Sequence, residues 1–353
     1  MQNINLRIIN MEDVETEQVT WLMKPYLPFG KISIVQGDPG EGKTTKMLAI
    51  AADITRGRAL PNSTATEPMS VIFQTAEDGL GDTIKPRLEE LGADCSRVHV
   101  IDESEKSLSL SDERIEEAII RTGARLLILD PAQAYFAGAD MNNAGGVRPL
   151  MKILAGVAER TGCAIVIIGH LNKSKSKSTY RGLGSIDIYA AARSVLTVGR
   201  ISEYTRAVVQ GKSNLAPPGK SLSFELDPVL GFRWLGECEA TVDDVMSGRS
   251  AKPQSQFAKA RRLIEMMLAD GYEVASKIII EAAEDEGISY KTLNRAKSEL
   301  GVITMKHSDG WYWQLPIDAV FTETSQYGQD DKVDRNHTLT TLSILEQKGG
   351  VPA

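Results

Sequence analysis

Long apolar runs and closely spaced cysteines are both missing from this 353-residue sequence. No run reaches about 18 apolar residues, the length that a membrane-spanning helix needs. The N-terminus lacks the basic-then-apolar pattern of a signal peptide. The sequence has three cysteines, Cys95, Cys163 and Cys238. They are far apart and form no CxxC pair, which argues against a zinc site or a disulfide framework. We therefore expect a cytoplasmic protein that has no membrane partner.

An excess of positive charge is also lacking, because the formal net charge is −7. A chain with this balance is not a general binder of polyanions. Any contact with nucleic acid must therefore come from local basic patches.

Short apolar runs alternate with amphipathic stretches in the first half of the chain. The runs predict strands at 31–36, 71–74, 98–101, 126–130 and 164–169, and the stretches predict helices at 44–54, 80–91, 112–122 and 147–161. This alternation indicates an α/β fold with a mostly parallel sheet that is flanked by helices on both faces. After residue 184 the pattern predicts four short strands and almost no helix, at 194–199, 206–211, 221–226 and 231–235. We expect these strands to extend the sheet in antiparallel fashion.

The turn between the first strand and the first helix matches the P-loop pattern Gly-x4-Gly-Lys-Thr in full. Its glycines allow backbone N–H groups to point at phosphate oxygens, and the helix N-terminus adds a positive dipole end. The Lys43 ammonium would reach the β- and γ-phosphates, and the Thr44 hydroxyl would bind magnesium. The alternative is an ordinary glycine-rich turn. The motif predicts ATP and Mg²⁺ binding with ATP hydrolysis, through Gly37, Asp38, Pro39, Gly40, Glu41, Gly42, Lys43, Thr44 and Thr45.

Two carboxylates that follow strands are candidates for the remaining chemistry. The apolar run 126–130 ends in Asp130, which would hold magnesium through water, or would instead cap the next turn. Residue 131 is proline, so the base that activates water has to come from elsewhere. Glu77 follows the second strand and is the candidate catalytic base. The alternative is that Glu77 and Asp78 only open the next helix, where acidic residues are favoured.

In combination, these motifs resemble the RecA-like ATPases of the hexameric replicative-helicase branch, especially the RepA-type ATPases of plasmids and prophages. The resemblance covers about residues 20–235 and includes Trp21-Leu22, the P-loop, Gln74-Thr75-Ala76-Glu77-Asp78, Leu129-Asp130-Pro131, Ile168-Gly169-His170-Leu171-Asn172-Lys173, Gly182-Leu183-Gly184-Ser185-Ile186 and Gly211-Lys212-Ser213-Asn214. It implies a RecA-like fold and a homo-oligomer, a ring of six subunits with ATP between neighbours.

The resemblance also implies roles for single residues. Glu77 would be the catalytic carboxylate, and His170 would sense the γ-phosphate, although a histidine at a strand end is also often held by a backbone bond. Lys212 would be the cation that acts on the ATP of a neighbouring subunit. The match is looser here, because many relatives pair this lysine with an arginine. Arg200 and Arg206 are alternatives, and a solvated surface lysine is a further one.

A basic, polar segment follows His170 directly and has no apolar periodicity. Positive charges between small hydroxyl residues suit a phosphate backbone. This position matches the DNA-binding loop of the family, so we expect single-stranded DNA to be bound here, and a solvated linker is the alternative. The stretch 138–148 would be a second central loop. The expected DNA-binding residues of the basic segment are Lys173, Lys175, Lys177 and Arg181.

The C-terminal part has its own pattern of two helices, a turn, a third helix and a hairpin about residues 307–310. This order resembles a winged helix. Lys291 and Arg295 lie on the candidate recognition helix and would contact duplex DNA, although winged helices also bind proteins. The domain organisation expected is a RecA-like ATPase domain at 1–240, a linker at 241–256, a winged-helix domain at 257–315 and a disordered tail at 316–353.

Together these features favour an ATP-dependent DNA helicase or translocase that acts in replication of a mobile element or prophage. The alternative is a DNA-binding regulator or replication loader that is switched by ATP and does not unwind DNA.

Overall fold

The computed structural model describes residues 8–136, 138–139, 141, 143–171, 186–246 and 255–316. Within these ranges, none of the helices has both the length and the apolar character that crossing a membrane requires. The expected disordered tail at 316–353, except for Pro316, and the basic segment after His170 lie outside them.

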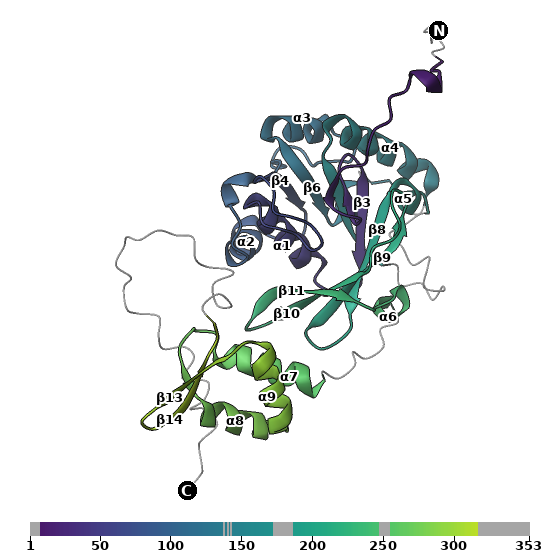
Figure 1. Ribbon diagram of the computed structural model, residues 1–353. Coiled ribbons are helices and arrows are strands. Elements are labelled where there is room, and N and C mark those ends of the chain that lie inside the picture. The colour runs from purple at the N-terminus through teal and green to yellow at the C-terminus, as the bar shows by residue number, and fades with distance from the viewer. Residues whose placement is uncertain are drawn as a thin grey trace.

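A nine-stranded sheet forms the centre of the fold, in the order β11-β10-β9-β8-β3-β7-β6-β4-β5 (Figure 1). The strands from β5 to β8 pair in parallel, and those from β8 to β11 pair antiparallel. This confirms the mostly parallel α/β sheet and its antiparallel extension. The strands are β3 Ile32–Gly37, β4 Ser70–Thr75, β5 Val98–His99, β6 Ala124–Asp130, β7 Ala164–His170, β8 Ser194–Arg200, β9 Thr205–Ser213, β10 Ser221–Asp227 and β11 Gly231–Cys238.

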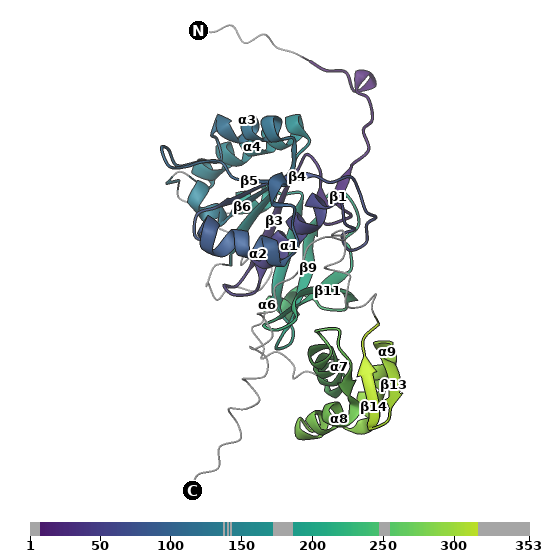
Figure 2. The same cartoon turned by 90° about the vertical axis from the view of Figure 1, so that its left-hand side faces the viewer.

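Helices cover both faces of the sheet and create two cores (Figure 2). Because successive side chains of a strand point to opposite faces, Leu126 and Ile128 join one core and Leu127 and Leu129 join the other. The first core is closed by α1 Lys43–Thr55, the π-helical turn η2 Leu80–Ile84 and α2 Lys85–Glu90. The second is closed by α3 Glu113–Thr122, α4 Ala144–Thr161 and α5 Ile186–Ala191.

Short elements complete this part of the chain. A small hairpin, β1 Trp21–Met23 and β2 Leu27–Pro28, precedes the first strand of the large sheet. Three single 3-10 turns are η1 Met11–Asp13, η3 Cys95–Arg97 and η4 Ala132–Tyr135.

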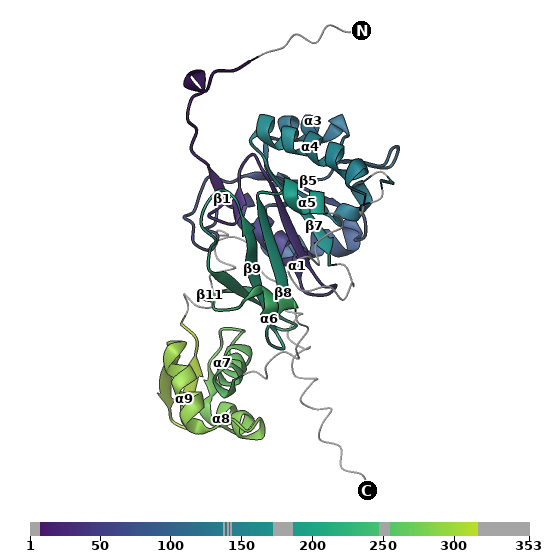
Figure 3. The same ribbon diagram turned by 90° about the vertical axis from the view of Figure 1, so that its right-hand side faces the viewer.

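The C-terminal residues build a separate core from three helices and a three-stranded sheet of order β12-β14-β13. The hairpin pairs His307 with Gly310 and turns at Ser308 and Asp309, where the sequence predicts it. Figure 3 shows α7 as the helix of this unit that lies nearest the antiparallel strands. The elements are α7 Gln256–Met267, β12 Val274–Ala275, α8 Ser276–Asp285, α9 Tyr290–Glu299, β13 Ile303–His307 and β14 Gly310–Gln314.

Three expectations about local structure differ from what is observed. The segment expected as a linker begins with a helix, α6 Val242–Met246, which buries Val245 and Met246 against the antiparallel strands. The helix α5 lies where almost no helix was expected. The expected second central loop, 138–148, is helical from Ala144 onward because α4 begins there. Each of these segments is too short or too polar for a periodic pattern to stand out.

Candidate functional site

The candidate site lies at the carboxyl edge of the parallel strands. Gly37 and His170 are register partners at the ends of β3 and β7, and Thr75 and Asp130 are partners at the ends of β4 and β6. The parallel pairing therefore brings the P-loop, the Asp130 carboxylate and the His170 ring to one edge, as the motifs predict. Ligands bind preferentially at this edge in α/β sheets.

The backbone of the P-loop depends on its glycines. Gly40 and Gly42 have φ values of 77° and 78°, in the left-handed region that other residues avoid. Gly37 is needed for a different reason, since a Cβ added there would lie 2.3 Å from the Val198 carbonyl oxygen. The end of β3 therefore packs closely on β8, and α1 begins after the turn at Lys43.

Lys43 lies beneath this loop and is only 5% exposed. Its ammonium donates to the carbonyl oxygens of Gly37 at 3.0 Å and Asp38 at 2.8 Å, and lies 3.3 Å from His170 Nδ1. Burial lowers the pKa of Lys43, while nearby carboxylates, Asp130 foremost, oppose that shift. The sole lysine of the motif is therefore held inside the loop, next to the strand-end histidine.

Thr44 and Asp130 form a direct pair, in which the Thr44 hydroxyl donates to Asp130 Oδ2 at 2.6 Å. Burial raises the pKa of Asp130 to about 6, against the opposing effects of the Thr44 hydrogen bond and the Lys43 charge. A hydroxyl and a carboxylate at a phosphate loop are hard oxygen ligands that fit Mg²⁺, which completes its shell with water and phosphate. No cluster of three or more His, Cys, Asp or Glu suited to a metal occurs in the part of the chain that the structure describes.

Glu77 is exposed two residues beyond the end of β4. Its charge has a small effect on two neighbours: it adds to the rise in the pKa of Asp130 and opposes the fall in the pKa of His170. The neighbouring Asp78 instead has structural partners, since its backbone N–H donates to the Thr75 hydroxyl and its carboxylate pairs with Arg87 at 3.5 Å. Glu77 thus remains exposed near the loop, while Asp78 anchors the turn into the next helix.

His170 ends β7, and its imidazole faces Lys43. Burial first, and then the Lys43 charge, lowers the pKa of His170. The ring is therefore neutral at pH 7, and Nδ1 can accept a hydrogen bond from the ammonium.

The three candidate cations for the γ-phosphate fall at opposite ends of the sheet. Lys212 is the register partner of Val195 near the start of β8, and its ammonium donates to the Tyr189 carbonyl oxygen at 2.7 Å. Arg200 and Arg206 are partners at the other end of the same ladder. Arg200 lies 3.9 Å from the Glu41 carboxylate of the P-loop.

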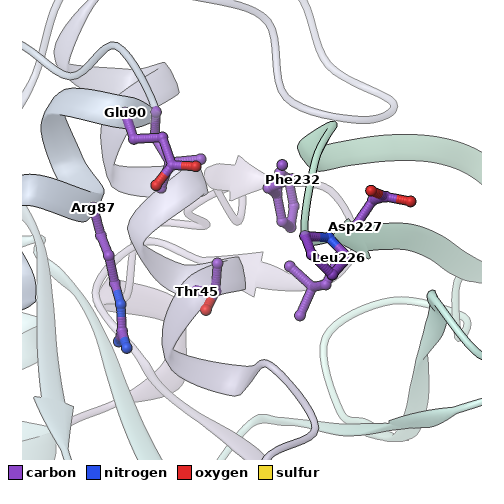
Figure 4. Close-up of a pocket in the computed structure, with 9 residues that line it drawn as sticks. Thr45, Arg87, Glu90, Leu226, Asp227 and Phe232 are labelled. Carbon is purple, nitrogen blue, oxygen red and sulfur yellow. The ribbon is translucent and has the colours of Figure 1, made fainter. Parts of the chain in front are cut away.

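A cavity of about 320 Å³ lies beside the first turn of α1 (Figure 4). One wall comes from α1 and α2, with Thr45 next to the phosphate loop and Arg87 farther out. The opposite wall is the hairpin β10–β11, whose Leu226 points toward α1 in Figure 4. The sequence motifs did not indicate these hairpin residues, since no local pattern links them to the P-loop. The lining is Thr45, Arg87, Glu90, Leu91, Leu226, Asp227, Pro228, Gly231 and Phe232.

The residues expected to bind DNA are only partly described. Lys173, Lys175, Lys177 and Arg181 lie outside the described residues. Lys291 and Arg295 are both exposed, four residues apart on α9, and therefore share one face of that helix. The Arg295 guanidinium also stacks 4.6 Å from the Phe257 ring centre.

Comparison with known proteins supports the nucleotide site. A family model described as an AAA domain matches residues 5–176, which include the P-loop, Asp130 and His170. The DNA repair protein RadA of Halalkalibacterium halodurans is 29% identical over 147 residues, covering 41% of this chain and 28% of that relative. RadA of Bacillus subtilis is 27% identical over 151 residues, covering 42% of this chain and 29% of the relative. The chain thus spans less than a third of the length of these relatives.

Two solved structures are similar at low identity. A KaiC-like protein of Pyrococcus horikoshii has a TM-score of 0.45 at 17% identity, covering 61% of this chain and 99% of its own. The ATPase domain of G40P has a TM-score of 0.45 at 14% identity, covering 58% of this chain and 84% of its own. The P-loop geometry, the strand order and the family match together support a P-loop ATPase with a RecA-like fold.

Proposed function

We propose that this protein is an ATP-dependent DNA translocase or helicase. The observation that carries the proposal is the contact between Lys43 and His170, at 3.3 Å, directly before the basic segment at 173–181. A change in the charge next to Lys43, such as loss of the γ-phosphate, reaches His170 without an intermediate residue. The chain then leads at once into the segment best suited to bind a phosphate backbone.

The same site gives each residue a role in hydrolysis. Lys43 neutralises charge on the β- and γ-phosphates, and Thr44 and Asp130 hold Mg²⁺, which neutralises further phosphate charge when bound. Glu77 polarises a water that attacks the γ-phosphorus, so that the bond to the β–γ bridging oxygen breaks and ADP leaves. The cavity next to Thr45 takes the ribose and base of the nucleotide.

Hydrolysis also needs a cation near the negative charge that develops on the γ-phosphate. Lys212 lies toward the amino end of its own sheet, away from its own P-loop, so it serves a neighbouring subunit. This favours a homo-oligomer, which we propose is a hexamer with ATP between subunits. Arg200, beside Glu41, assists instead within its own subunit.

The C-terminal unit is proposed to be a winged helix that binds duplex DNA. Its element order and the shared exposed face of Lys291 and Arg295 support this assignment. Because α6 packs on the large sheet, we place the end of the ATPase domain at Met246 rather than at residue 240.

The link to DNA also draws on the relatives, which are named DNA repair proteins. Replication of a mobile element or prophage remains the proposed setting. The rival function, a DNA-binding regulator or replication loader switched by ATP, would use the C-terminal unit and depend little on the basic segment.

The test removes the four cations of the basic segment together. The variant should keep its basal ATPase rate but lose stimulation by single-stranded DNA, because these charges lie outside the phosphate loop. Each lost cation should lower the salt slope of single-strand binding by about 0.7. ATPase rates are measured with and without single-stranded DNA over a salt series, beside forked-duplex unwinding and a sizing measurement. The substituted residues are Lys173, Lys175, Lys177 and Arg181.

A matched control removes four exposed cations elsewhere, which changes net charge equally: Lys85, Lys106, Arg121 and Lys277. The proposal predicts normal stimulation of this control. Equal stimulation of both variants would favour the regulator.

A further inference from the structure

Helix α7 of the C-terminal unit is fastened to the hairpin β10–β11 by a buried carboxylate. The Asp227 side chain is 0% exposed and accepts hydrogen bonds from the Arg262 guanidinium. It also accepts from the backbone N–H groups of Val229 at 2.8 Å and Leu230 at 3.1 Å. The Arg262 guanidinium lies 4.6 Å from the centre of the Tyr204 ring. Arg262 therefore joins α7 to two turns of the antiparallel sheet at once.

A second group of ion pairs reinforces this contact. The Arg233 guanidinium of β11 donates to Glu225 of β10 at 2.5 Å and to Glu265 of α7 at 2.8 Å. The Glu265 side chain is only 9% exposed and also accepts from Arg261 at 3.1 Å. Charges this buried hold one geometry, because separating them leaves an unpaired buried charge. The pairs thus fix the position of the hairpin relative to α7.

The same hairpin presses on the phosphate loop. A Cβ added at Gly42 would lie 2.3 Å from Leu226 Cδ1 and 3.4 Å from Phe224 Cε2, so both side chains pack on the loop. Leu226 precedes Asp227, and strand alternation turns the two side chains to opposite faces, as Figure 4 shows. One face of β10 therefore touches the P-loop, while the other is held by α7.

We propose that Arg262 is a positioning residue for nucleotide binding, which acts through Asp227 on the wall of the cavity beside Thr45. The inference rests on the proposed nucleotide site and extends it to a residue outside the ATPase motifs. Without Arg262, the Asp227 carboxylate is left buried without its cation and moves toward water. Leu226 and the cavity wall move with it, so contacts with the ribose and base are lost.

The coupling has to act in both directions, because linkage between two binding events is reciprocal. A nucleotide that stabilises the cavity wall also stabilises the contact between α7 and the hairpin. Conversely, a ligand of the C-terminal unit that displaces α7 changes the affinity for nucleotide. The C-terminal unit thereby reports its own binding state to the phosphate loop.

The test compares Arg262→Ala with the control Lys277→Ala, which removes a cation of the same unit that is 85% exposed. Arg262→Ala should weaken ATP binding about 5- to 150-fold, the usual range for coupled sites. The KM should rise similarly with kcat little changed, because the catalytic groups stay in place, and Arg262→Lys should recover part of the loss. Lys277→Ala should bind ATP like the wild type. Unchanged binding by Arg262→Ala, or equal weakening in both, overturns the proposal.

A second measurement uses the unaltered protein and therefore does not depend on whether the variant folds. Hydrogen exchange of the backbone amides of α7 should slow when ADP is added. Absence of slowing, with ADP bound, overturns the coupling and leaves the nucleotide site intact. If the wild type binds no nucleotide, or if Lys43→Ala binds it equally well, the proposed function fails and the coupling fails with it. If the protein binds nucleotide but DNA does not change its ATPase rate, only the helicase assignment is wrong.

Discussion

Replacing Gly42 with alanine tests whether the hairpin β10–β11 packs on the phosphate loop. Gly42 has a φ of 78°, and this left-handed conformation costs a non-glycine residue about 1–2 kcal/mol. The new methyl group would also lie 2.3 Å from Leu226 Cδ1, and relief of such overpacking typically costs about 1–3 kcal/mol. Because Leu226 Cδ1 is the end of a flexible side chain, the lower part of that range applies. We expect Gly42→Ala to lower the free energy of unfolding by about 2–4 kcal/mol in total.

Gly40 supplies a matched control in the same loop. Its φ is 77°, but a Cβ there would meet nothing within 4 Å, so Gly40→Ala should cost only the backbone term of about 1–2 kcal/mol. In a Leu226→Ala background, Gly42→Ala should fall to the same cost, since the two sites are in contact and non-additive. Urea unfolding without nucleotide, followed by tryptophan fluorescence, measures the wild type, the three single variants and the double variant. Equal losses for Gly40→Ala and Gly42→Ala would refute the packing, and with it the path from α7 to the phosphates.

Two further changes test the chemistry of the site. Lys43→Ala should abolish ATP hydrolysis and sharply weaken nucleotide binding, because the loop loses its lysine; wild-type turnover would show that the phosphate-loop assignment is wrong. Glu77→Gln should still bind ATP but hydrolyse it about 10²–10⁴-fold more slowly, the usual effect of losing a general base. Normal turnover in that variant, measured by phosphate release, would limit Glu77 to the turn before η2 and point to Asp78.

Much of the ATPase fold follows from local patterns in the sequence. The P-loop motif fixes a strand, a turn with two left-handed glycines and a helix, so β3 and α1 agree with prediction to within about a residue at each end. Asp130 and His170 could be expected at the same edge, because both end apolar runs and parallel strands share their carboxyl edge. Local periodicity and strand direction together are sufficient for this part.

The wall of the cavity beside Thr45 could not be predicted in this way. Leu226 and Asp227 are about 180 residues beyond the P-loop, and nothing in the sequence around them signals a nucleotide. Their position at the cavity depends on the order of β8 to β11, which places β10 over Gly42, and pattern alone does not fix that order. The Asp227–Arg262 pair is even harder to predict from the sequence, because its two residues belong to units that a polar stretch of the sequence separates. The ATP-binding motifs all lie upstream of the C-terminal unit and give no sign that this unit affects nucleotide binding.

The charges at the catalytic edge favour an oligomer as the complete form of the enzyme. Asp130, Asp38, Glu41 and Glu77 all act electrostatically on Lys43, which is the lysine inside the loop. ATP adds further negative charge, while Mg²⁺ and Arg200 balance only part of it. The Lys212 ammonium donates to the carbonyl oxygens of Tyr189 and Ala190 at the other end of the sheet, so it cannot reach this edge in its own subunit. A cation from a neighbouring subunit, as proposed above, would balance this charge, so we expect basal activity to rise with assembly before DNA is added.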